Sequence, residues 1–113
     1  MKSFILLFFV FGTVNSSPHS NNVIELGRKI YIQRCKVCHG IKGNVNPFAA
    51  AVLGPPPRNF TSENSGKNLT EERMIRSATN GRPGTAMMPW KNILSPEEIH
   101  AVIYYIRKEI MKL

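Results

Sequence analysis

Residues 35–39 read Cys35-Lys36-Val37-Cys38-His39, and this pentapeptide decides the expected fold. Its two thiols stand at a spacing that lets them add to the two vinyl groups of one haem. The adjacent His39 can then reach the iron as an axial ligand. The pattern predicts one covalently attached haem c, with Cys35 and Cys38 as anchors and His39 as a metal ligand.

Other interpretations of the pentapeptide fit less well. A thioredoxin-like redox pair needs a strand-to-helix context, which the neighbouring sequence lacks. A structural zinc site needs a full set of Cys and His ligands, and the chain offers only His19 and His100 besides the pentapeptide. A plain disulfide between Cys35 and Cys38 would leave His39 without a role.

A helix is expected on the N-terminal side of the pentapeptide. The stretch Val23–Arg34 lacks Pro, and an apolar stripe runs through Gly27 and Tyr31 to Cys35. The helix should end at or just after Cys35.

Two further helices are expected towards the C-terminus. Thr70 is the predicted cap of one, which closes at Asn80-Gly81. The last helix has Ser95 at its cap, Pro96 at the first helical position and Glu98 in a capping box. Its apolar face consists of Ile99, Val102, Ile103, Ile106 and Ile110.

Residues 40–67 are rich in Gly and Pro and predict a long loop, with one short helical turn over Phe48–Leu53. A loop of this length is unusual in a compact domain unless it wraps around something large. A haem is a large apolar body of this kind. We therefore expect a mostly α fold, with three main helices and long loops around one haem and no strand of useful length.

A second iron ligand is expected in the Pro- and Gly-framed loop 81–90, which contains Met87 and Met88. Thioether ligation raises the reduction potential of a haem. His100 lies off the apolar stripe of its helix and is expected to be solvated.

These features make the chain resemble the small class I cytochromes c. The haem motif, the run Pro83-Gly84-Thr85-x-Met87 and the closing Tyr105-Ile106-Arg107 carry the resemblance. It implies the cytochrome c fold and Met87 as distal ligand. Met88 remains the alternative, because it precedes Pro89 in a Met-Pro pair.

The resemblance also implies a hydrogen bond that supports the axial histidine. A Pro carbonyl between the two iron ligands accepts the histidine N–H in this family. The implied acceptor is the carbonyl of Pro55, Pro56 or Pro57.

The N-terminus has the layout of a secretory signal peptide over residues 1–16. Lys2 precedes the apolar run Phe4–Phe11, and Val14 and Ser16 have cleavage-site spacing. The run is shorter than the ~20 residues of a membrane helix, so no transmembrane span is expected after cleavage. We expect a flexible leader at 17–22, a cytochrome c domain at 23–113 and export, most simply to a bacterial periplasm.

The chain is basic, with 15 Lys+Arg against 7 Asp+Glu and a net charge of +8 at pH 7. Export argues against nucleic acid as the partner. Lys36, Lys42, Arg82 and Lys91 cluster in sequence around the haem motif and the Met loop. They predict a basic ring that steers the protein to acidic docking patches on redox partners. A basic surface that serves only solubility is the alternative.

The predicted function is one-electron transfer between redox complexes. With both axial positions filled, the iron has no open site for substrate, so no enzyme activity is expected. The alternative is a haem enzyme or gas-binding sensor with a labile Met ligand. A free shuttle and a fixed subunit of a larger complex both remain open.

Overall fold

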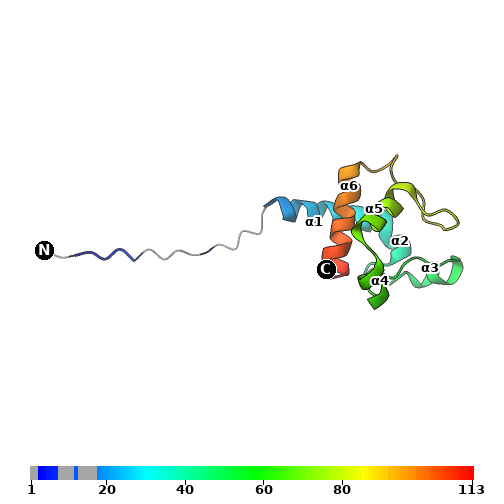
Figure 1. Cartoon of the computed structure of the whole chain (residues 1–113), viewed down its shortest axis with the longest axis horizontal. Helices are drawn as coiled ribbons and strands as arrows, with labels where there is room; N and C mark the ends of the chain where they lie inside the picture. The colour runs from blue at the N-terminus through cyan, green and yellow to red at the C-terminus, as the bar shows by residue number, and fades with distance from the viewer. Residues whose placement is uncertain (1–2, 8–11, 13–17) are drawn as a thin grey trace.

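The structure is a computed structural model that describes residues 3–7, 12 and 18–113. Within these residues the regular structure is helical and contains no strand, as predicted (Figure 1). The predicted signal peptide lies largely outside the described residues, and its cleavage site lies wholly outside them. No helix in the described part of the chain has the length and apolar character needed to cross a membrane.

The N-terminal helical segment is longer than the sequence pattern suggested. Helix α1 spans Pro18–Ile30 and continues through the π-helical segment η1, Tyr31–Cys35, into α2, Lys36–His39. The expected helix began at Val23, so the structure differs for residues 18–22, which were expected to form a flexible leader. Proline at the first helical position explains the earlier start, because its backbone is already arranged for a helix.

Two short helices lie within the segment that was expected to be a long loop. Helix α3 spans Pro47–Val52, close to the predicted turn, and Asn46 caps it. Helix α4 spans Glu63–Asn68 and was not predicted. The segment that begins at residue 40 therefore contains two short helices and is not an unstructured loop.

The two C-terminal helices begin where their caps predicted. Helix α5 spans Glu71–Asn80, and the Thr70 hydroxyl accepts the Arg73 N–H at 3.2 Å. Helix α6 spans Pro96–Tyr105 and continues as the π-helical segment η2, Ile106–Ile110. Ser95 and Glu98 form the predicted capping box, with bonds of 3.1 and 3.0 Å.

Helices α1 and α6 cross in close contact (Figure 1). Gly27 makes this crossing possible, since a Cβ there would lie 2.2 Å from the Ala101 carbonyl oxygen. Next to it, the Tyr31 and Tyr105 rings lie 5.6 Å apart. The predicted stripe through Gly27 and Tyr31 is thus the surface that meets the last helix.

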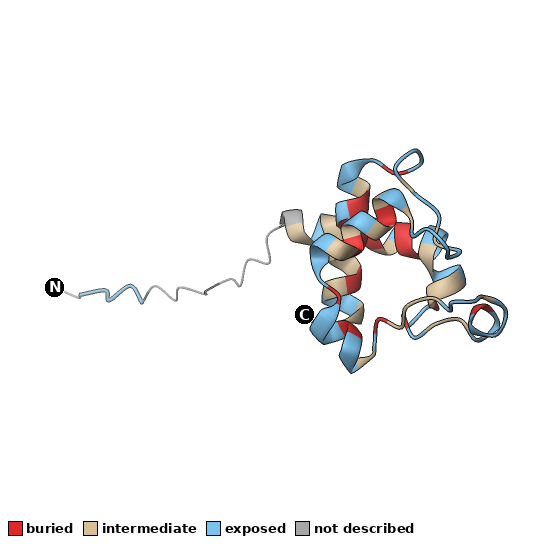
Figure 2. Cartoon of the chain, turned by 45° about the vertical axis from the view of Figure 1, so that its right-hand side comes forward, coloured by how far each residue is buried: buried red, intermediate tan, exposed pale blue. Residues whose placement is uncertain are grey.

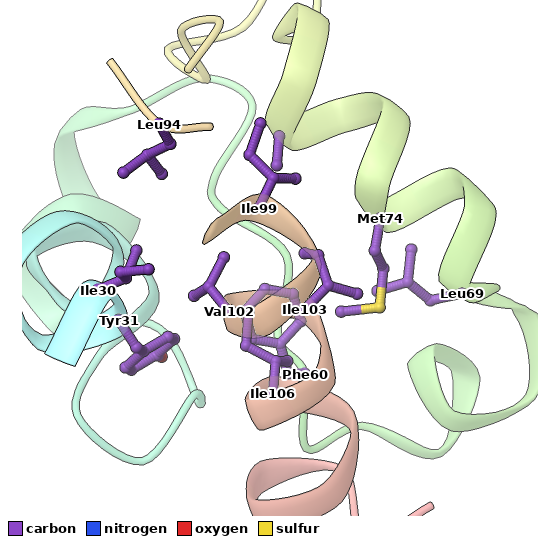
Figure 3. Packing of buried hydrophobic residues seen from close by; sticks show 11 residues of the cluster. Ile30, Tyr31, Phe60, Leu69, Met74, Leu94, Ile99, Val102, Ile103 and Ile106 are labelled. Atoms are coloured by element: carbon purple, nitrogen blue, oxygen red, sulfur yellow. The ribbon is translucent and has the colours of Figure 1, made fainter. Parts of the chain in front are cut away.

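The core surrounds α6. Figure 3 shows Ile30 and Tyr31 on one side of this helix and Met74 and Leu69 on the other. Figure 2 shows the buried segments concentrated where the helices meet. The predicted apolar face of the last helix is confirmed, with Ile99, Val102, Ile103 and Ile106 buried and Ile110 packed at the edge.

Candidate functional site

The pentapeptide lies where η1 passes into α2, so Cys35, Cys38 and His39 occupy about one and a half turns of continuous helix. Both thiols are free and half-buried. Burial, and secondly the charge of Cys38, raise the pKa of Cys35 to about 12. In the bare chain the Cys35 thiol is therefore protonated at neutral pH.

The backbone after the pentapeptide is tied back onto it. The N–H of Asn46 bonds to the Cys38 carbonyl at 2.9 Å, and the N–H of Val45 bonds to the His39 carbonyl at 2.8 Å. Val45 takes up a φ of 74°, which is rare for a β-branched residue. Two backbone bonds to the pentapeptide thus accompany the unfavourable conformation of Val45.

Tyr31 holds the same segment from the other side. Its side chain is fully buried, and its hydroxyl donates to the Gly40 carbonyl at 2.5 Å. Burial is the main cause that raises the pKa of Tyr31 well above its usual range. The hydroxyl therefore remains a donor at physiological pH.

The His39 ring is held by a hydrogen bond and by a stacked aromatic ring. Its Nδ1 lies 3.0 Å from the Arg58 carbonyl oxygen. A carbonyl only accepts, so Nδ1 carries the proton and Nε2 keeps its lone pair. The Phe60 ring stacks on the imidazole, with centroids 4.4 Å apart and 14° between the planes.

Burial lowers the pKa of His39, and the bond to Arg58 opposes this effect. A lowered pKa favours the neutral ring, which is the form that binds metals. The ring thus presents Nε2 as a free donor atom.

The predicted acceptor for the histidine N–H was wrong. The carbonyl belongs to Arg58 and to none of the three prolines at 55–57. The chain is anchored beyond the prolines: the Arg58 guanidinium bonds to Ser65, and the Phe60 N–H bonds to the Gly43 carbonyl at 2.8 Å. These anchors place the peptide that follows the proline run against the ring.

The loop with the two methionines is folded back on itself. The Met87 N–H bonds to the Thr85 hydroxyl at 3.1 Å, and the Arg82 N–H bonds to the Met87 carbonyl at 3.0 Å. Gly81, with a φ of 68°, passes so close that a Cβ would lie 2.7 Å from that carbonyl oxygen. Met87 packs against the core, whereas Met88 is 45% exposed.

The donor atoms fit a covalently attached haem better than a metal ion alone. The pentapeptide provides two free thiols and a histidine whose Nε2 is available. Among the residues that the structure describes, no three His, Cys, Asp or Glu side chains gather as a metal site. His100 is exposed on α6, as expected.

The sequence pattern predicted the pentapeptide and the Met loop as the segments of the site, and it did not indicate the contacts of Arg58 and Phe60 with His39. The proline run indicated the right segment of chain for the histidine acceptor. The sequence does not distinguish the carbonyl of residue 58 from those of residues 55–57, because every residue has a main-chain carbonyl whatever its side chain.

Comparison with known proteins places these features in a family. The family model described as Cytochrome c matches residues 24–109. The solved structure "KustC0563 c-type cytochrome" is 36% identical, over 72% of this chain and 93% of that chain, with a TM-score of 0.63.

Two further solved structures are similar. One is a chain of the "Kuenenia stuttgartiensis reducing HAO-like protein complex Kustc0457/Kustc0458", 27% identical over 74% of this chain and 41% of that chain, with a TM-score of 0.61. The other is the "c-type cytochrome NirC", 25% identical over 80% of this chain and 94% of that chain, with a TM-score of 0.57.

Proposed function

The chain belongs to the cytochrome c family, and from this premise we propose that it is an exported one-electron carrier with a single haem c. Cys35 and Cys38 form the thioether bonds in this proposal. His39 and Met87 are the axial ligands of the iron, with Met88 as the alternative to Met87.

The geometry of His39 carries this proposal. Its Nδ1–H is engaged by the Arg58 carbonyl at 3.0 Å, which leaves Nε2 as the free donor. A histidine that binds a metal generally donates its other ring N–H to a carbonyl or carboxylate, which fixes the tautomer. Cys35 and Cys38 lie within the same helical segment, as attachment of one haem requires.

Burial supports Met87 as the second axial ligand. Met87 packs against the core that includes residues of α5 and α6, whereas Met88 is 45% exposed. A haem iron with both axial positions filled exchanges one electron at a time and offers no coordination site to a substrate. One-electron transfer therefore fits this ligand set better than catalysis.

The charged surface supports a role for electrostatic docking. Lys36, Lys42, Arg82 and Lys91 are all exposed, on α2, on the loop that follows it and on the Met loop. Positive side chains around the attachment site would speed the encounter with an acidic patch on a redox partner. One similar chain is part of a multi-protein complex, so a fixed relay within an assembly is the variant of this proposal to test against a free shuttle.

The proposed cellular location is the bacterial periplasm. The layout of residues 1–16 matches a secretory signal peptide, and haem attachment to a C-x-x-C-H motif takes place outside the cytoplasm. In this proposal cleavage after Ser16 leaves residues 17–22 ahead of the cytochrome c domain at 23–113.

The experiment is to express the full chain with haem-attachment machinery and to purify the coloured protein. One haem per chain should survive acid–acetone extraction and appear in the intact mass. The ferric spectrum should show the weak red band that is characteristic of a methionine–iron bond. Freely extracted pigment would contradict covalent attachment. A spectrum without the red band, together with carbon monoxide binding, would favour the sensor or enzyme alternative.

A further inference from the structure

The segment Arg58–Phe60 contacts the His39 ring in two different ways. The Arg58 carbonyl accepts the Nδ1 proton in the ring plane at 3.0 Å. The Phe60 ring lies parallel to the imidazole, at 4.4 Å between centroids, and is 7% exposed. The in-plane bond and the face-on contact together leave the imidazole little freedom to rotate.

A buried serine holds this segment in place. Ser65 is fully buried, and its hydroxyl donates to the Asn59 carbonyl at 2.5 Å. The Ser65 hydroxyl oxygen in turn accepts the Nε–H of Arg58 at 3.0 Å. A second guanidinium nitrogen of Arg58 bonds to Asn64 at 3.0 Å. Helix α4 thereby holds the Arg58 side chain and the Asn59 carbonyl, on either side of the carbonyl that faces His39.

The other face of the segment is tied to the loop behind the pentapeptide. The Phe60 N–H bonds to the Gly43 carbonyl at 2.8 Å. Segment 58–60 is therefore held by α4 on one side and by residue 43 on the other.

We propose that Phe60 and Ser65 are positioning residues that set the rotational angle of the His39 imidazole about its bond to iron. Phe60 acts by stacking on the ring, and Ser65 acts through its bonds to the Arg58 guanidinium and the Asn59 carbonyl. The inference rests on the proposed ligation of the iron by His39, and it concerns residues outside the proposed set of haem anchors and iron ligands.

The angle of the axial ring has a measurable electronic effect. In a ferric haem the orientations of the axial ligands, the histidine plane among them, determine how unpaired spin is distributed among the four ring methyl groups. The hydrogen bond at Nδ1 increases electron donation by the imidazole, so a weaker bond favours the ferrous iron. Both effects are read in the loaded protein without an assay of its partner.

The test compares Phe60→Leu and Ser65→Ala with wild type, by proton NMR of the ferric protein and by redox titration. Leucine keeps an apolar side chain at 60 but cannot stack. Ser95→Ala is the matched control, because it removes a serine hydroxyl with a structural bond from a helix cap outside the segment. We expect an altered pattern of haem methyl shifts in both variants and an upward shift of the potential in Ser65→Ala. The control should keep the wild-type pattern.

Two outcomes separate this inference from the proposed function. Wild-type ferrous protein should show His39 ring protons moved far upfield by the haem ring current. If that signal is absent, the proposed ligation fails. If the signal is present and Ser65→Ala keeps the wild-type methyl pattern and potential, the positioning role is overturned. Ser65→Ala decides the matter even if Phe60→Leu does not fold.

Discussion

At the scale of the residue, the choice between Met87 and Met88 can be tested directly. Leucine nearly conserves the volume of methionine and cannot ligate iron. We expect Met87→Leu to abolish the red methionine–iron band, to lower the potential and to open the iron to cyanide. Met88→Leu should keep the band, since this side chain is 45% exposed. The opposite result would move the ligand to Met88, and retention of the band in both variants would mean that either residue can serve.

Tyr31 offers a second test at this scale. Tyr31→Phe removes the buried hydroxyl that donates to the Gly40 carbonyl, which keeps the Gly43 N–H as its other donor at 3.1 Å. Loss of one such hydrogen bond costs about 0.5–1.5 kcal/mol of unfolding free energy, measurable by denaturation of the haem-loaded protein. Tyr104→Phe is the control, because it also removes a tyrosine hydroxyl. The half-buried Tyr104 interacts through its ring, whose centroid lies 5.9 Å from Lys108 Nζ, and phenylalanine keeps that ring. Equal losses in the two variants would mean that the Tyr31 hydroxyl contributes nothing specific.

The pH dependence of the same variant has a definite sign. Burial raises the pKa of Tyr31 in the folded protein. Above pH ~10 the unfolded chain loses this proton while the folded protein keeps it, so the stability falls as pH rises. Tyr31→Phe should flatten this alkaline decline. An unchanged slope in urea titrations above pH ~10 would contradict the assignment.

The local pattern was enough to predict the residues with distinctive chemistry. Cys35, Cys38 and His39 fall within five consecutive residues, so their spacing alone predicts the site. Arg58, Phe60 and Ser65 act through a main-chain carbonyl, a ring face and a buried hydroxyl. No sequence pattern marks these three residues, because only the folded chain brings them close to His39.

At the scale of the element, the crossing of α1 and α6 depends on the absence of a side chain at residue 27. Gly27→Ala would place a methyl group 2.2 Å from the Ala101 carbonyl oxygen, so one of the helices must shift. Such overpacking typically costs about 1–3 kcal/mol. We expect a loss of this size in denaturant unfolding.

Gly66→Ala is the matched control for the crossing. A Cβ at Gly66 meets nothing within 4 Å, and this glycine lies inside α4. Alanine is preferred over glycine within a helix, so this variant should be neutral or more stable. Similar losses at both positions would contradict a specific close approach at Gly27.

Helix ends were predicted correctly where the capping residue lies next to the helix in the sequence. Thr70 and Ser95 are the caps seen in the structure, because a cap needs only a side chain and a nearby N–H. Helix α4 was missed because its sequence, Glu63–Asn68, is polar and has no apolar stripe. Its only buried member is Ser65, whose bonds to the Arg58 guanidinium and the Asn59 carbonyl are contacts outside the helix.

At the scale of the whole molecule, the proposed docking role depends on where the positive charges lie. Lys36→Glu, Lys42→Glu and Lys91→Glu together should slow electron transfer to an acidic partner without changing the optical spectrum. The wild-type rate should fall as salt rises, because the Debye length is about 8 Å near 0.15 M ionic strength.

A control with the same total charge isolates the effect of position. The control reverses three exposed charges elsewhere, on α1, on η2 and at the C-terminal end: Lys29→Glu, Lys108→Glu and Lys112→Glu. This triple variant should lose less of the rate at low salt than the first. Equal losses would mean that net charge, rather than a ring around the haem attachment site, governs the encounter.

The π-helical turn at Tyr31–Cys35 acts as an inserted residue in an otherwise regular helix, with the Lys36 N–H bonded to the Tyr31 carbonyl. Deleting Gln33, which is exposed, would restore ordinary helical bonding and keep the phase of His39 relative to the Gly27 crossing, because the wide turn already absorbs one residue. The same 27–39 spacing on a uniform α-helix would instead turn His39 by about 100°, away from the Arg58 carbonyl, although every residue of the pentapeptide would still be present. For protein engineering, the transplantable module is therefore Gly27–His39 with its extra residue, and grafting the pentapeptide onto a uniform helix would deliver the thiols and the imidazole at the wrong phase.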